Sequence, residues 1–183
     1  MNDKIGNRTY LALKNLYRNS QEIQDEVNKL DFRGRDGDLA YAKEFATIKL
    51  CGPRRSGHSE AIAKFIKEYY QGNWAIITVT LHNTELIREK IRYQLLKPTT
   101  KPNKNPIATK LTQAAITIKD GKDEGIIHLM SMYNFDNALR GLNLTGIIVD
   151  CASLLSKSKV EELYQVGMPC MKNHRYQFFI FVE

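Results

Sequence analysis

Residues 45–70 constrain the fold more than any other part of the chain. Phe45 to Leu50 form a short apolar run, a loop with two glycines follows, and Glu60 to Tyr70 carry apolar residues at helical spacing. This order predicts a buried strand, a loop and an amphipathic helix. A strand that leads through a short loop into a helix is the repeating unit of α/β proteins, in which most strands are parallel. We therefore expect an α/β fold.

The loop in this unit has the spacing of a phosphate-binding P-loop, G-x-x-x-x-G-K-[ST], except at one position. Its residues are Gly52, Pro53, Arg54, Arg55, Ser56, Gly57, His58 and Ser59. In such a loop backbone N–H groups surround the β-phosphate, the lysine neutralises phosphate charge and the hydroxyl binds Mg²⁺. The sequence predicts that the whole loop binds nucleotide and that Ser59 is a metal ligand. His58 replaces the lysine, and its imidazole is shorter and largely neutral near pH 7.

Strand and helix patterns continue to alternate after this unit. We expect strands at 74–81, 114–119, 125–132, 145–149 and 176–182, helices at 85–96 and 158–165, and a hairpin turn at Asp120-Gly121. Parallel strands end at one edge of a sheet, where ligands bind, and Asp150 directly follows one of them. We interpret Asp150 as a Walker B carboxylate that holds Mg²⁺ through water. The alternative is an aspartate that caps the following turn.

The N-terminal part has a helical pattern of its own. Apolar residues recur at helical spacing from Thr9 to Leu30, and Asn19-Ser20 is a plausible break. This predicts a helical hairpin, with a charged, glycine-containing loop after it. We expect residues 1–38 to form this hairpin and loop, and residues 39–183 to form one domain.

The balance of charges favours an anionic partner. The chain has a formal net charge of +7, with 27 Lys and Arg against 20 Asp and Glu. Nucleic acid is the first candidate, and a generally basic surface is the alternative. The predicted nucleic-acid-binding residues are Arg88, Arg92, Lys97, Lys101 and Lys104. Without a long apolar run or a signal peptide we expect a cytosolic protein with no membrane contact, and the three cysteines lack zinc-site spacing.

With these motifs in order, the chain resembles the N-terminal ATPase domain of viral terminase large subunits, the DNA-packaging motors of tailed phages and herpesviruses. The resemblance covers residues 45–182, and includes the paired arginines of the loop, Arg140-Gly141 ahead of the strand that ends at Asp150, and the last strand. It implies a three-layer P-loop NTPase fold of the RecA and helicase type, with ATP and Mg²⁺ as cofactors. It also implies that Arg54 or Arg55 contacts the γ-phosphate and, with Asp150, takes part in catalysis. The alternative for the arginine pair is simple surface charge.

Cys151 departs from the terminase pattern, which has a glutamate after the Walker B aspartate. Because the lysine and this carboxylate are both missing, our first hypothesis is a catalytically weakened domain that acts in nucleic-acid binding or DNA packaging. The second is an active, DNA-stimulated ATPase in which arginine replaces the lysine and another carboxylate, such as Glu183, is the base. The third is a module that docks through its hairpin and regulates an active motor. The implied partners are DNA, further copies of the chain and viral motor or portal proteins, in the host cytoplasm or nucleus.

Overall fold

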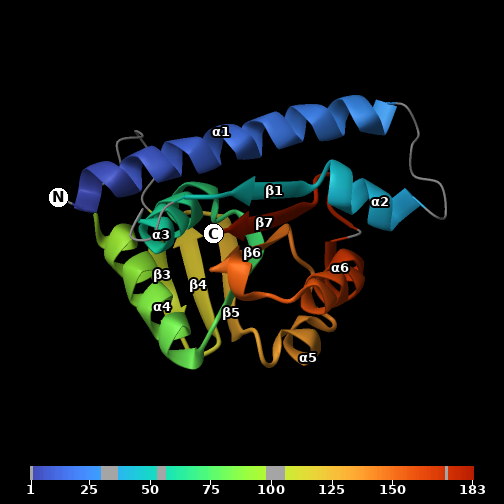
Figure 1. Ribbon diagram of the computed structural model, residues 1–183. Helices are drawn as coiled ribbons and strands as arrows, with labels where there is room; N and C mark the ends of the chain where they lie inside the picture. Colours follow the sequence, from blue (N-terminus) through green and yellow to red (C-terminus); the bar gives the residue numbers. More distant parts are fainter. Residues whose placement is uncertain (1, 30–36, 53–56, 98–105, 172) are drawn as a thin grey trace.

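The computed structural model describes residues 2–29, 37–52, 57–97, 106–171 and 173–183. A seven-stranded sheet lies between two layers of helices (Figure 1). One face is covered by α1 (Asn2–Lys29), α3 (His58–Tyr69) and α4 (Leu81–Leu96), and the other by α2 (Gly37–Glu44), α5 (Phe135–Leu139) and α6 (Lys157–Met171). This arrangement confirms the predicted three-layer α/β fold.

The sheet is mostly parallel. Its strands are β1 (Thr47–Leu50), β2 (Gly72–Thr78), β3 (Ile107–Leu111), β4 (Ala115–Asp120), β5 (Asp123–Ser131), β6 (Gly146–Asp150) and β7 (Phe178–Val182). They lie in the order β1-β7-β6-β2-β5-β4-β3, and only β4 runs against its neighbours. The last strand therefore lies between the strand before the P-loop and the strand that ends at Asp150. Strands that are far apart in the sequence are thus neighbours in the sheet.

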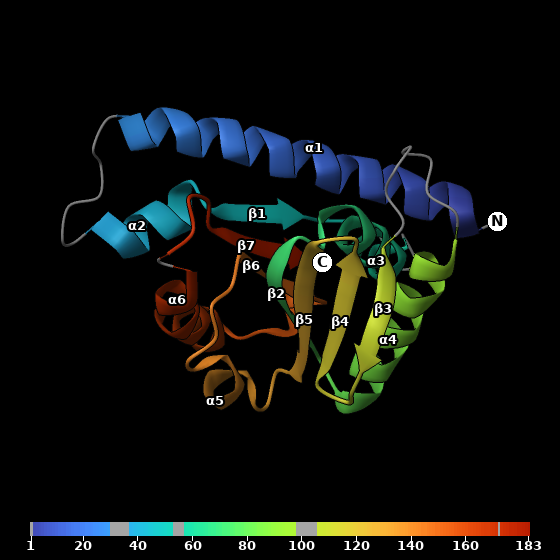
Figure 2. The same ribbon diagram turned by 180° about the vertical axis from the view of Figure 1, so that it is seen from behind.

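The antiparallel end of the sheet contains the predicted hairpin. Asp120 pairs with Asp123, so the β4–β5 turn has two residues (Figure 2). Gly121 adopts a φ of 62°, which glycine reaches at little cost. Strand β3, which follows the proline-rich segment, was not predicted, and neither were the short helices α2 and α5. Their sequences are too short for a clear periodic pattern.

Strand β7 shows why the sheet is buried on both faces. All five of its residues, Phe-Phe-Ile-Phe-Val, are buried. Phe178 and Ile180 pack with α1, α3 and α4, while Phe179 and Phe181 pack with α2, α5 and α6. A nearly continuous apolar run is expected for a parallel strand with helices on both sides. Burying each such side chain stabilises the fold by about 1.5–3 kcal/mol.

The predicted N-terminal hairpin is wrong. Helix α1 continues without a break through Asn19 and Ser20. Ser20 faces inward, and its hydroxyl donates a hydrogen bond of 3.0 Å to the carbonyl oxygen of Phe45. Gln24, one turn later, is fully buried, and its amide bonds both the N–H and the C=O of Gln177. Ser20, one of the two residues that suggested a break, therefore anchors α1 to the backbone beside the sheet, as Gln24 does.

In the described parts of the chain, no helix combines the length and the apolar character that a membrane span requires.

Candidate nucleotide-binding site

Three parallel strands place the predicted site residues at one edge of the sheet. The N–H of Gly52, just after β1, donates to the carbonyl oxygen of Glu183 at 3.0 Å. Asp150, the last residue of β6, lies in register with Val182 of β7. Helix α3 begins with His58 at this same edge. The sheet therefore brings together both ends of the predicted P-loop and Asp150.

Gly57 occupies a position that requires glycine. It precedes α3 with φ 77° and ψ 28°, in the left-handed region. A Cβ atom there would lie 2.9 Å from the Cα of Gly6 in α1. The carbonyl oxygen of Gly57 accepts the N–H of Ala61 at 2.9 Å, which is the first turn of the helix. The free N–H groups and the positive end of the helix dipole at this point favour a bound anion.

Ser59 and Asp150 meet in the arrangement that the sequence predicts for a metal site. The Ser59 hydroxyl donates to Oδ2 of Asp150 at 3.2 Å. A hydroxyl that donates its proton to this carboxylate keeps its lone pairs for Mg²⁺, and Asp150 would reach the ion through a bound water. Among the described residues no group of three His, Cys, Asp or Glu side chains could hold a metal. The remaining ligands would have to come from phosphate and water.

Asp150 is buried, and its burial disfavours the charged form of the carboxyl group. Burial raises the pKa of this carboxyl above its usual value, although the hydrogen bond from Ser59 and the nearby His58 and Lys90 act in the opposite direction. Lys90 lies on α4, and sequence reasoning did not single it out. No motif marks it, because only the packing of α4 places its charge near Asp150.

We expect Asp150→Asn to stabilise the protein by about 1 kcal/mol at pH 7 in the absence of nucleotide, because the variant buries no charge. A carboxyl whose folded pKa is raised binds more protons when folded than when unfolded. The unaltered chain should therefore lose stability as the pH rises from the unfolded pKa of Asp150 through its raised folded pKa. Urea unfolding at a series of pH values measures this slope, which Asp150→Asn should reduce. Asp136→Asn, at a less buried position on α5, is the control for the change in stability at pH 7 and should not stabilise the protein in this way.

His58 supplies little positive charge in place of the lysine. Burial lowers the pKa of its imidazole, and the attraction of Asp150 offsets this only in part. Its Nε2 atom is buried, and the described residues provide no hydrogen-bond partner for it. The side chain is therefore mostly neutral near pH 7, as the sequence predicted.

Cys151 follows Asp150 in a left-handed conformation with φ 62°, the only positive φ of a described residue other than glycine. Its Sγ lies 3.9 Å from Oδ1 of Asp150. Burial, together with the charge of Asp150, raises the pKa of the thiol, so it stays protonated at neutral pH. A thiol of this kind does not replace a carboxylate base.

Glu183, the substitute base of the second hypothesis, lies on the opposite face of the sheet from Ser59. It follows β7 two residues after Phe181, which packs toward α2 and α6, and side chains alternate along a strand. Its carboxylate accepts a hydrogen bond from Cys51 Sγ at 3.6 Å and borders a pocket of about 480 Å³ that Lys49 also lines. Glu183 is thus not directed at Asp150.

The other predicted site residues fall into two groups. Pro53, Arg54, Arg55, Ser56, Lys101 and Lys104 lie outside the described residues. Arg88 and Arg92 lie on α4 and flank Glu89, at N–O distances of 3.8 and 3.7 Å. The Lys97 ammonium lies 4.4 Å from the centre of the Tyr93 ring. These cations belong to α4 and the residue that follows it; Arg88 and Arg92 lie about 40° apart around the helix at 100° per residue.

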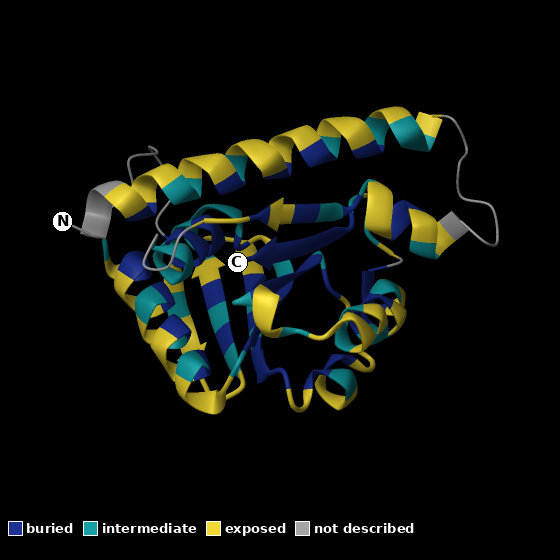
Figure 3. Cartoon of the chain, viewed as in Figure 1, coloured by how far each residue is buried: buried dark blue, intermediate teal, exposed yellow. Residues whose placement is uncertain are grey.

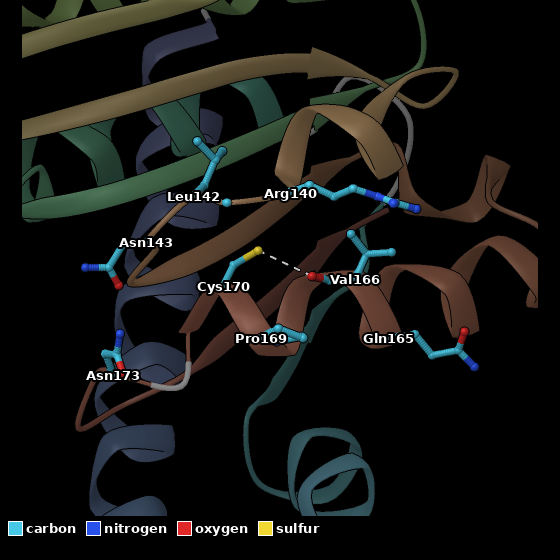
Figure 4. Close-up of a pocket in the computed structure, with 9 residues that line it drawn as sticks. Arg140, Leu142, Asn143, Gln165, Val166, Pro169, Cys170 and Asn173 are labelled. Carbon is cyan, nitrogen blue, oxygen red and sulfur yellow. Dashed lines mark hydrogen bonds between the residues drawn. The ribbon is translucent and has the colours of Figure 1, made fainter.

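Arg140-Gly141 is part of the terminase resemblance. It lies near the amino ends of the parallel strands, whereas Asp150 lies at their carboxyl ends. The pair precedes β6, whose carboxyl end carries Asp150. Arg140 borders a pocket of about 610 Å³ between the turn at 140–143 and the second half of α6 (Figure 4). Within one copy of the chain, Arg140 is therefore remote from the P-loop.

Solved structures of phage terminases have a similar fold. The large terminase of a thermophilic bacteriophage matches with a TM-score of 0.52 and 12% identity, over 80% of this chain and 37% of that chain. The ATPase domain of the large terminase of Thermus phage P74-26 matches with a TM-score of 0.51 and 18% identity, over 84% of this chain and 66% of that domain. No family profile and no curated protein sequence matches. The chain therefore has the fold of the ATPase domain of phage large terminases.

Proposed function

We propose that this chain is a terminase-like P-loop domain that binds a nucleotide, hydrolyses it slowly and acts on nucleic acid. One observation carries the proposal. The hydroxyl of Ser59 and the carboxylate of Asp150 meet at the start of α3, as a Mg²⁺–phosphate site needs. At the same place His58 and Cys151 occupy the positions of the lysine and glutamate on which rapid hydrolysis depends.

The described residues have separate roles in this proposal. The N–H groups at the start of α3 bind phosphate oxygens, and Gly57 allows the chain to turn into the helix. Ser59, and Asp150 through water, hold Mg²⁺, which neutralises phosphate charge when it is bound. Arg54 and Arg55 remain proposed γ-phosphate contacts, since a guanidinium can bind phosphate through two hydrogen bonds.

Calorimetric titration with ATP and Mg²⁺, together with a turnover assay, tests this proposal. We expect Mg²⁺-dependent binding, and hydrolysis at least about 100-fold slower than the roughly 10 s⁻¹ typical of enzymes. Absence of binding would contradict the proposal. DNA-stimulated hydrolysis at an ordinary rate, abolished by Asp150→Asn, would instead establish the active ATPase.

Arg88 and Arg92 of α4, with Lys97 after it, are the proposed nucleic-acid contact. Replacing Arg88, Arg92 and Lys97 by Gln should weaken DNA binding at low salt and reduce the slope of log K against log salt by about 2 to 3, because each lost phosphate contact removes about 0.9. Fluorescence anisotropy with a labelled duplex measures this slope. The control replaces Lys119, Lys122 and Lys159, which lie on other elements, and should change it little. Equal effects of the two triple variants would contradict a specific contact at α4.

A further inference from the structure

Helix α1 carries a second apolar stripe on its exposed side. Ile5, Ala12, Leu16 and Ile23 lie within about 40° of one another around the helix at 100° per residue. All four are exposed, and Ile5, Leu16 and Ile23 have exposed fractions of 42%, 37% and 49%. Figure 3 shows exposed positions along the whole outer side of α1. The buried side of the same helix, with Leu13 and Tyr17, is a separate face. Thr9 and Asn19 lie on the same side of the helix between these residues, so the exposed face repeats apolar side chains with polar ones among them. An exposed apolar surface on a helix often marks an interaction site.

The stripe lies on one flank of α1, roughly 90° around the helix from its buried side. On the opposite flank of α1, Tyr10 and Lys14 both bond Glu68 of α3, and the Lys14 ammonium lies 2.8 Å from that carboxylate. The stripe lies roughly 140–180° around the helix from these two residues. Among the described strands β1, beneath α1, pairs only with β7 and is an edge of the sheet. A partner helix could therefore lie along the stripe, beside this edge, without meeting α3.

Charges beside the stripe favour one kind of partner. Arg8, Asn15 and Glu22 are exposed and follow one another at intervals of seven residues along a single flank. The described residues provide no ion pair for Arg8 or Glu22. In an antiparallel helix pair the residues of this flank face the same flank of the partner. A second copy of α1 in antiparallel orientation thus brings Arg8 to glutamate and Asn15 to asparagine, whereas in a parallel pair this flank faces the other flank of the partner.

We propose that two copies of this chain dimerise through α1 in an antiparallel pair. With a two-fold axis near residues 14 and 15, Ile5 packs against Ile23 of the partner subunit, and Ala12 packs against Leu16 of the partner subunit. The same register pairs Arg8 with Glu22 of the partner subunit. One register therefore satisfies both the apolar and the charged positions, as an interface between identical copies requires. The proposal goes beyond the proposed function, because it needs neither nucleotide nor nucleic acid.

Sedimentation velocity of the full chain from about 1 to 200 µM, without nucleotide, provides the first test. We expect a reversible monomer–dimer equilibrium. Leu16→Asp should weaken the dimer at least about 10-fold, because it introduces a charge into an apolar contact. Leu11→Asp is the matched control, since Leu11 is also exposed, at 54% against 37% for Leu16, on the same helix but lies about 120° from the stripe. A monomer throughout this range, or equal effects of the two variants, would overturn the proposal.

Charge reversal then tests the register. Arg8→Glu and Glu22→Arg should each weaken the dimer at least about 5-fold, since each places like charges together at two symmetric positions. The double variant should recover most of the loss, because it restores opposite charges. A double variant as weak as the worse single variant would rule out the antiparallel pairing. Circular dichroism should show unchanged helix content for all variants, since the altered side chains are exposed.

Discussion

The double variant His58→Lys, Cys151→Glu is expected to hydrolyse ATP at least about 100-fold faster than the unaltered chain. The lysine would supply the positive charge that the mostly neutral imidazole lacks. The glutamate would orient and activate the attacking water, and a positioned base typically contributes 10²–10⁴-fold. Cys151 already has a positive φ, so a glutamate there adds little new backbone strain. Steady-state phosphate release with saturating ATP and Mg²⁺ is the measurement.

The matched control is His58→Lys, Cys151→Gln, which keeps the new lysine and the size of the second side chain but lacks a base. Its rate should stay near that of the unaltered chain. Rapid hydrolysis by the unaltered chain would contradict a weakened site. A double variant that binds ATP and Mg²⁺ but gains no activity would show that positions 58 and 151 do not limit the reaction.

Gln24→Leu is expected to lower the free energy of unfolding by about 3 kcal/mol. The side chain has no exposed surface and bonds the backbone of Gln177 twice, at 2.8 and 3.0 Å. Leucine fills a similar volume but leaves a buried N–H and a buried C=O without partners, and each costs about 1–3 kcal/mol. Chemical unfolding followed by circular dichroism measures the change.

Gln21→Leu is the control for this anchor. Gln21 lies on the same helix, is only partly buried, and makes one long hydrogen bond of 3.4 Å to the Tyr17 hydroxyl. This variant should stay within about 0.5 kcal/mol of the unaltered chain. Similar losses in both variants would mean that the change in α1 itself, and not the bond to β7, determines the effect.

The parts of the fold that could be predicted depend on local patterns. The strand, loop and helix of residues 47–69 follow from apolar spacing, and the turn at Gly121 follows from its Asp-Gly pair. Asp150 was expected at the P-loop edge because parallel strands end together, and its hydrogen bond with Ser59 places it there. These features follow from the periodic spacing of apolar residues and from the rule that parallel strands end on the same side of a sheet.

The errors and omissions concern contacts between distant segments. The break expected at Asn19-Ser20 is absent because the Ser20 hydroxyl bonds the backbone of Phe45. The proximity of Lys90 to Asp150 depends on how α4 packs, and the face of the sheet on which Glu183 lies depends on the register of β7. A single sequence carries no periodic signal for such pairings.

The sequence by itself determined the α/β unit, the P-loop spacing with His58, and the change to Cys151 after Asp150, because each is a pattern of neighbouring residues. Only the tertiary structure decided that β7 lies between β1 and β6, that Ser59 meets Asp150, and that α1 is one helix with a buried face and an exposed apolar stripe. The physical reason is that burial and hydrogen bonding depend on what other segments supply. The polar groups of α1 have their partners in Phe45 and Gln177, far away in the chain.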